Sequence, residues 1–138
     1  MNRREILATS VALAAVSSQV LAQGMQSHDH GQGTNGLVTA AAGCIQAGAA
    51  CTSHCLERFG DASFAACARA SDAMTAVAGA LLKLAVNKSD QLPAIARVAM
   101  AVCQTCEQEC RKHVEHAPCR ACADSCAKTI AECKRVIG

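Results

Sequence analysis

The cysteines of this chain recur at the spacing of an α-helix. There are eleven among 138 residues, and ten of them form three runs with intervals of three, four or seven positions. At about 100° per residue, these intervals return a side chain to the same helix face. The runs are Cys44, Cys51 and Cys55; Cys103, Cys106 and Cys110; and Cys119, Cys122, Cys126 and Cys133. Each run therefore predicts a helix with a stripe of thiols narrower than an ordinary apolar face.

Turn signals divide the chain into four helical stretches, and none of them shows the alternation of a strand. Asp61 or Ser63 is suited to cap the second helix. Asp90 is suited to cap the third, and Pro93 and Pro118 suit the first turns of the third and fourth. The expected helices are residues 37–58, residues 62–87, a third from its cap at residue 90 to about 115, and residues 118–136. Four helices of similar length with short links predict an all-α fold, an antiparallel four-helix bundle.

Few large apolar side chains are available to fill such a bundle. Alanine is abundant, and the aromatic residues are two phenylalanines with no Trp or Tyr. Because alanine favours helix but buries little surface, cysteine, a small and usually buried residue, is expected to line the core. The second helix continues its stripe with other residues: Cys67, Ser71, Met74, Ala78 and Leu81. The formal charge of +2, with both signs interspersed, gives no indication of a nucleic-acid partner.

Antiparallel threading predicts that most thiols gather at one end of the bundle, where the first and third helices end and the second and fourth begin. The cysteines expected there are Cys51, Cys55, Cys67, Cys106, Cys110, Cys119 and Cys122. About 10–20 Å farther along, at 1.5 Å per residue, we expect Cys44, Met74, Met100, Cys103 and Cys133. The opposite end should be closed by apolar packing of Leu81, Leu84, Leu92 and Ile95.

The start of the chain is typical of an export signal. Arg3 and Arg4 precede an apolar run, and Val20-Leu21-Ala22 is similar to an A-x-A cleavage site. The apolar run is too short to span a bilayer as a permanent helix, so no membrane association is expected. The predicted parts are a twin-arginine-type signal peptide at 1–22, a flexible polar tail at 23–36 and the bundle domain at 37–138. We therefore expect an exported, periplasmic protein.

Several kinds of cysteine chemistry compete to explain the stripes. Disulfides suit an exported structural or interaction protein, but eleven is an odd number, and cysteines three or four apart on a helix face the same way. Zinc and iron–sulfur clusters take four thiolates. One such site, formed by Cys103, Cys106, Cys119 and Cys122, would leave seven thiols unexplained. Enzymatic activity is not expected, because no cysteine belongs to a recognisable nucleophile pattern and no C-x2-C pair has a βαβ context.

Cu(I) explains the whole stripe. It is soft, prefers thiolate and is satisfied by as few as two ligands. Helix neighbours three or four positions apart lie about 5–6 Å apart at Cβ, so two of their sulfurs can hold one ion. If each thiolate bridges two ions and each ion takes two thiolates, the column is neutral and holds roughly one Cu(I) per cysteine. The sequence therefore predicts storage of many Cu(I) ions, with copper or zinc detoxification as an alternative purpose.

These motifs resemble the copper storage protein family of bacteria. The similarity extends from Cys44 to the C-terminus and rests on Cys44-x6-Cys51-x2-His54-Cys55, on the Asp61-Ala62-Ser63 turn before Cys67, and on two C-x2-C-x3-C units. The resemblance implies a four-helix bundle that holds Cu(I) along its interior and, for exported members, a homotetramer. The sequence does not indicate which proteins donate or accept the copper.

Residues other than cysteine are also candidates for copper contact. His54 matches a family position at the mouth of the bundle, and the thioether of Met74 can contact copper as well as pack. His113, His116 and Met100 are weaker candidates. The resemblance also has two departures, because Ala78 and Thr129 stand where relatives carry cysteine, near the expected inner face. These departures predict a lower capacity for copper.

Overall fold

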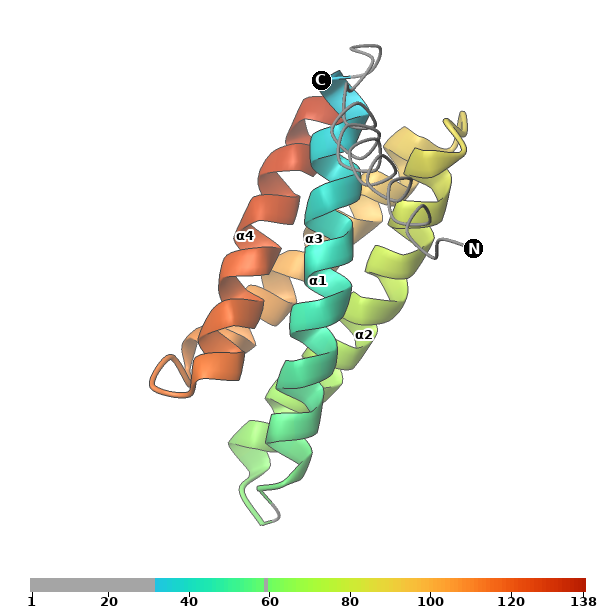
Figure 1. The fold of residues 1–138 in the computed structure, drawn as a ribbon. Coiled ribbons are helices and arrows are strands. Elements are labelled where there is room, and N and C mark those ends of the chain that lie inside the picture. The colour runs from blue at the N-terminus through green and yellow to red at the C-terminus, as the bar shows by residue number, and fades with distance from the viewer. Residues whose placement is uncertain (1–31, 59) are drawn as a thin grey trace, which may run out of the picture. The chain divides into compact units, whose positions relative to one another are not determined.

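The chain forms four α-helices, and the residues that the structure describes contain no strand. This computed structural model describes residues 32–58 and 60–138 (Figure 1). The helices are α1 (Gln32–Leu56), α2 (Ala62–Val86), α3 (Leu92–Arg111) and α4 (Ala117–Ile137). The predicted all-α four-helix bundle is therefore confirmed. The predicted signal peptide at 1–22 and residues 23–31 of the predicted tail lie outside the described residues.

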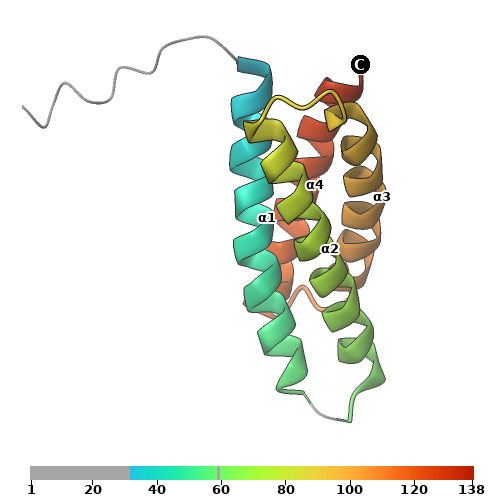
Figure 2. The ribbon, with the colours of Figure 1, turned by 90° about the vertical axis from the view of Figure 1, so that its right-hand side faces the viewer.

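Successive helices run in opposite directions and lie side by side (Figures 1 and 2). α1 packs against α2 and α4, and α3 packs against the same two helices. The links α1–α2 (57–61) and α3–α4 (112–116) lie at one end of the bundle, which we call the mouth end. The α2–α3 link (87–91) and the end of α4 lie at the other, which we call the closed end. This threading places the start of α4 beside the end of α1, as the cysteine stripes require.

The caps of α2 and α3 differ in how well the sequence predicted them. Asp61 caps α2, because its Oδ1 accepts hydrogen bonds from the backbone N–H of Ser63 at 2.9 Å and from the Ser63 hydroxyl at 2.6 Å. The predicted cap at Asp90 is wrong. The chain leaves α2 through Lys88, which has a positive φ of 50°. After this turn, the hydroxyl oxygen of Ser89 accepts a hydrogen bond of 3.2 Å from the backbone N–H of Gln91.

Two helix bounds also differ from the sequence prediction. α1 begins at Gln32, not near residue 37, and Leu37 in its second turn is fully buried. The polar composition before Leu37 is typical of a flexible tail. Burial of the Leu37 side chain instead extends α1 towards the N-terminus, to Gln32. α3 ends at Arg111, not near residue 115, because the N–H of His113 bonds to the Cys110 carbonyl and begins a series of tight turns. Those turns bring the ring of His113 back over the mouth end.

The interior consists of two clusters of different chemistry. The sulfur core comprises Cys44, Cys51, Cys55, Phe64, Cys67, Ala68, Met74, Ala78, Cys103, Cys106, Cys110, Cys119, Cys122, Ala123, Cys126 and Ile130. The apolar core comprises Leu37, Ala41, Leu81, Ala85, Leu92, Ala96, Ala99 and Cys133, with Leu84 and Ile95 packed against it. The predicted apolar closure by leucines is therefore confirmed. Cys133 differs from the expectation, since it belongs to the apolar core and not to the column of thiols.

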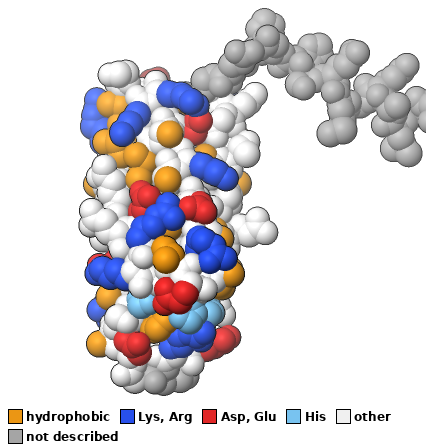
Figure 3. Space-filling model, turned by 90° about the vertical axis from the view of Figure 1, so that its left-hand side faces the viewer, with side chains coloured by type: hydrophobic (Ala, Val, Ile, Leu, Met, Phe, Trp, Pro, Cys, Tyr) orange, Lys and Arg blue, Asp and Glu red, His pale blue; other side chains and the backbone are white. Residues whose placement is uncertain are grey.

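The outer face carries charges of both signs (Figure 3). Surface pairs such as Arg111–Asp124 at 2.8 Å link α3 and α4 across their exposed sides. Histidine side chains gather towards one end of the face that Figure 3 shows. None of the described helices is both long enough and apolar enough to cross a membrane.

Candidate metal centre

All eleven cysteines are buried and free. α1, α3 and α4 contribute their thiols from a single stripe each, and α2 contributes Cys67. Ten of these thiols fall into four groups whose Sγ atoms lie within 4.8 Å of one another. The groups are Cys51, Cys55, Cys67 and Cys119; Cys51, Cys110 and Cys122; Cys106, Cys122 and Cys126; and Cys44, Cys103 and Cys126. Because neighbouring groups share Cys51, Cys122 or Cys126, they form one continuous column.

The layer nearest the mouth end joins α1, α2 and α4. The Sγ of Cys51 lies 3.7 Å from that of Cys67 and 3.8 Å from that of Cys119. The Sγ of Cys119 is in turn 3.9 Å from that of Cys55. Four thiols from three helices therefore surround one point, whereas each of the other groups has three.

The middle of the column is carried by α3 and α4 with Cys51. The Sγ of Cys110 lies 3.7 Å from that of Cys51 and 3.9 Å from that of Cys106. Cys106 and Cys122 bring their sulfurs within 3.6 Å across the α3–α4 interface. These are non-covalent contacts between thiols rather than disulfide bonds, since a disulfide has an S–S length of about 2.05 Å.

The layer farthest from the mouth end contacts the hydroxyl oxygen of Thr129. Cys44, Cys103 and Cys126 form its three-sulfur group. The Sγ of Cys44 lies 3.1 Å from the hydroxyl of Thr129, whose side chain is fully buried. Thr129 thus stands on the inner face of α4, as its spacing predicted. A hydroxyl oxygen is a harder ligand than a thiolate, so the column of soft ligands is interrupted here.

The remaining predicted candidates lie around the part of the column that faces the closed end. Met74 is fully buried in the sulfur core, and Ala78, one helical turn beyond, is 1% exposed. Gly48 of α1 gives Met74 its space, because a Cβ at this glycine would lie 2.7 Å from the Met74 Cε. Met100 is only partly buried and packs against both cores. Cys133 belongs to none of the four thiol groups.

Contacts between thiols stabilise particular thiolates. Hydrogen bonds from neighbouring thiols, Cys103 first, lower the pKa of Cys44 to about 4. The pKa values of Cys51 and Cys106 are also lowered, and the main cause for both is a hydrogen bond from the thiol of Cys110. Cys44, Cys51 and Cys106 are distributed over the four groups, so each group contains at least one thiolate that hydrogen bonds from neighbouring thiols stabilise. Thiolate is the form that binds metal.

Other cysteines have the opposite tendency, and they include Cys55 and Cys119 at the mouth end and Cys133 in the apolar core. Burial raises the pKa of Cys119 to about 12 and that of Cys133 to about 11. Burial is also the main reason why the pKa of Cys55 is raised. Without a metal these three thiols are therefore held in the neutral form. A cation that replaces their protons removes the cost of burying a thiolate.

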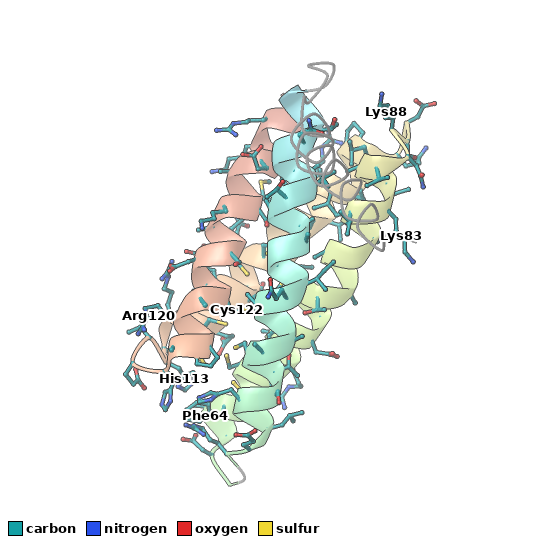
Figure 4. All side chains as sticks on the ribbon, in the orientation of Figure 1. Phe64, Lys83, Lys88, His113, Arg120 and Cys122 are labelled. Atoms are coloured by element: carbon teal, nitrogen blue, oxygen red, sulfur yellow. The ribbon has the colours of Figure 1, made fainter. Side chains whose placement is uncertain are left out.

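Aromatic and basic side chains cover the mouth end of the column. Phe64 is stacked on His113, with ring centroids 4.1 Å apart, and Figure 4 shows the two side by side below Cys122. His116 meets the edge of Phe64 at 5.2 Å, and the guanidinium of Arg58 lies 5.4 Å from the centre of the same ring. His54 lies 5.0 Å from His116, between ring centroids. Phe64 is thus the centre of a cover made by α1, α2 and the α1–α2 and α3–α4 links.

Two histidines of this cover have unused nitrogen atoms. The Nε2 atoms of His54 and His113 are buried and have no hydrogen-bond partner among the described residues. Burial lowers the pKa of His54, so its imidazole is held neutral. His116 instead contacts Arg58, with its Nδ1 3.3 Å from a guanidinium nitrogen. A shallow pocket beside the cover is lined by both Cys55 and Arg58.

Sequence reasoning identified every cysteine of the column but missed the role of Phe64. This residue lies three positions before Cys67 on α2 and is 7% exposed. The helical interval of three places the ring on the same face as the thiol, and this signal could have identified it. The stacking on His113 was not predictable, because it depends on the turns after α3.

The arrangement suits a soft monovalent metal. Each group offers three or four sulfurs at one point, and the groups share members along the bundle. A chain of ions linked by bridging thiolates would satisfy every sulfur without leaving an unpaired charge in the core.

Comparisons with known proteins agree on the fold. A family model described as copper storage protein matches residues 30–138. The structure is similar to the Cu(I)-bound copper storage protein BsCsp3, with a TM-score of 0.72 and 24% identity over 78% of this chain and 100% of that chain. It is also similar to apo copper storage protein 3 from Bacillus subtilis, with a TM-score of 0.68 and 24% identity over 76% of this chain and 99% of that chain. No match was found among curated proteins.

Proposed function

Because the chain belongs to the copper storage protein family, we propose that it stores many Cu(I) ions through cysteine thiolates inside its four-helix bundle. The observation that carries this proposal is the continuity of the thiol column. Ten buried, free cysteines form overlapping groups from the mouth end to Thr129. A single-site function needs only one such group, whereas storage uses all of them.

The number of ions follows from charge. In a buried column each Cu(I) must be balanced by one thiolate, because unpaired charge in a dry core is costly. Ten cysteines share groups, and the eleventh, Cys133, lies in the apolar core. The expected load is therefore about ten Cu(I) per chain, slightly below one per cysteine.

The proposal is tested by anaerobic Cu(I) titration of the reduced protein against a competing chelator. We expect saturation near ten equivalents, with nearly all eleven thiols reactive after unfolding of the metal-free protein. A load of one or two equivalents would overturn storage. Bridging of most cysteines in a fresh anaerobic preparation would favour the alternative of a disulfide-stapled structural protein.

We propose further that the store is periplasmic and exported by the twin-arginine pathway. The adjacent Arg3 and Arg4 before an apolar run, with Val20-Leu21-Ala22 as the cleavage site, support this. Replacing both arginines by lysine should retain the precursor in the cytoplasm, as cell fractionation would detect. Normal export of this variant would contradict the pathway.

We also propose that the chain works as a homotetramer and without catalytic turnover. The family resemblance supports the tetramer. The lack of catalytic turnover is supported by the thiol groups, because all but one of the cysteines belong to them and no separate nucleophile site remains among the cysteines. Light scattering of the purified protein should give about four times the mass of the processed chain. A monomeric mass would contradict the assembly without affecting copper storage.

A further inference from the structure

The mouth-end layer differs from the rest of the column in the number of its ligands. Cys51, Cys55, Cys67 and Cys119 are the four-cysteine group, and the other groups have three members each. All four side chains are buried, the least so being Cys55 at 3% exposure. We propose that these four thiolates form a tetrahedral site for one divalent d10 cation, Zn²⁺ above all, which occupies the layer when Cu(I) is scarce.

Three of the six Sγ···Sγ distances in the group match those of a tetrahedral zinc site. With Zn–S bonds of about 2.3 Å, the sulfurs of an ideal tetrahedron lie about 3.8 Å apart. The measured Sγ···Sγ distances are 3.7 Å for Cys51–Cys67, 3.8 Å for Cys51–Cys119 and 3.9 Å for Cys55–Cys119. All remaining pairs of the group are within 4.8 Å. The ligands are therefore nearly in place before the metal arrives.

Three helices hold this geometry. α1 supplies Cys51 and Cys55 one turn apart, α2 supplies Cys67 and α4 supplies Cys119 from its first turn. A single ion here would therefore join three of the four helices at the mouth end. The group also differs from the four-thiolate site that the sequence analysis considered. Sequence reasoning combined the C-x2-C pairs of α3 and α4, whereas the structure places Cys103 and Cys106 in other layers.

The surroundings can offset part of the charge of the site. Four thiols release four protons when they bind Zn²⁺, and the resulting site has a net charge of −2. The Arg58 guanidinium lies at the same end and shares a pocket wall with Cys55. The unpartnered Nε2 atoms of His54 and His113 are further groups that can donate a hydrogen bond there. The three-sulfur group of Cys44 has the neutral hydroxyl of Thr129 instead.

The proposal goes beyond copper storage and predicts one site for a divalent ion in a column for many monovalent ions. Cu(I) prefers thiolate more strongly than Zn²⁺ does and needs only two sulfurs, so copper should displace the ion and then occupy these thiolates itself. The zinc-loaded protein would thus be the form present before copper arrives.

The experiment uses Co²⁺ as a spectroscopic probe of the same geometry. Co²⁺ is added anaerobically to the reduced, metal-free chain, and visible absorption is recorded. We expect the intense bands of tetrahedral four-thiolate Co²⁺, saturating at about one equivalent per chain and abolished by one equivalent of Zn²⁺. The variant Cys55→Ser should lose the four-thiolate spectrum. The matched control Cys126→Ser, which lies in two three-sulfur groups but not in this one, should keep it.

The outcomes separate this site from the storage function. Circular dichroism establishes that both variants remain helical, and Cys119→Ser replaces Cys55→Ser if that variant does not fold. The proposal would be overturned by absence of the four-thiolate spectrum in the unmodified chain or by several equivalent Co²⁺ sites. It would also be overturned if Cys126→Ser lost the spectrum and Cys55→Ser kept it. Cu(I) capacity is measured on the same preparations. A preserved capacity with no Co²⁺ site would reject the zinc site and leave copper storage standing.

Discussion

The sulfur core and the apolar core occupy the same bundle, yet they are built for different tasks. α1 passes through both on one uninterrupted stripe of buried positions: Leu37, Ala41, Cys44, Gly48, Cys51 and Cys55. The alternating intervals of four and three are those of an ordinary bundle helix. Only the identity of the side chains changes, from leucine and alanine near the closed end to cysteine near the mouth end.

The difference shows that metal capacity and stability reside in separate parts of one fold. A buried leucine removes far more apolar surface from water than a cysteine does, so the apolar core supplies most of the hydrophobic stabilisation per residue. The sulfur core instead supplies ligands. The metal-free bundle should therefore already be helical, held by the apolar core and by its alanine-rich helices.

The largest effect is expected from the apolar core. Leu81→Ala removes a fully buried side chain and should lower the free energy of unfolding of the metal-free protein by about 2–5 kcal/mol. Cu(I) capacity should stay the same in the folded fraction. Urea denaturation and Cu(I) titration measure the two quantities. Val86→Ala, at a position 61% exposed on the same helix, is the control and should change neither.

Loss of copper from Leu81→Ala at conditions where it remains folded would break this comparison. It would mean that the apolar core helps to shape the metal column, and that the two regions are not separable.

A smaller effect on stability, but a larger one on capacity, is expected from the sulfur core. Cys51→Ser removes one thiolate of the column and should lower the load by about one Cu(I), because each buried Cu(I) is balanced by one thiolate. Cys133→Ser, in the apolar core, should leave the load unchanged. Chelator-competed titration of both variants decides the matter. Equal losses would place Cys133 in the column after all.

The boundary between the two regions can be moved by one residue. Thr129 is fully buried and 3.1 Å from the Cys44 sulfur, so Thr129→Cys should extend the column and raise capacity by about one ion. Ala78→Cys, at 1% exposure on α2, should act similarly but with a packing cost of about 1–3 kcal/mol. If a reduced, folded Thr129→Cys protein binds no additional copper, the boundary is not set by ligand chemistry.

The smallest equilibrium effect is expected at the mouth cover. Phe64→Ala removes the ring that stacks on His113, so stopped-flow mixing should show Cu(I) uptake several-fold faster while the final load is unchanged. Leu56→Ala, at a residue 57% exposed at the same end, serves as the control. An unchanged rate with Phe64→Ala would show that copper reaches the column by another path.

Helix periodicity made most of the fold predictable from the sequence. The narrow stripes of α1, α3 and α4 determine which face is buried, and the structure buries all eleven cysteines, together with Thr129 and Ala78. Antiparallel threading alone predicted the two heights at which most of the thiols gather, but not their division into four groups. Cys133 was the exception: its interval of seven from Cys126 gives its face correctly, but not the leucines and alanines that surround it.

Features that depend on links or on several helices at once were not predictable. The turns after α3 decide where His113 lies, and the left-handed Lys88 decides that Ser89, not Asp90, bonds to the start of α3. The four-cysteine group was missed for a similar reason. Its members come from three helices, and motif spacing within the chain does not reveal which helices meet at a given height.

The most direct test of the account is the position of copper in crystals of the fully loaded protein, obtained from anomalous scattering at the copper edge. We expect about ten copper peaks in a line inside the bundle, from the layer of Cys55 to that of Cys44, and none among the leucines of the apolar core. Copper bound mainly to surface histidines, or an interior without copper and with bridged cysteines, would contradict the claim that the sulfur core is the store.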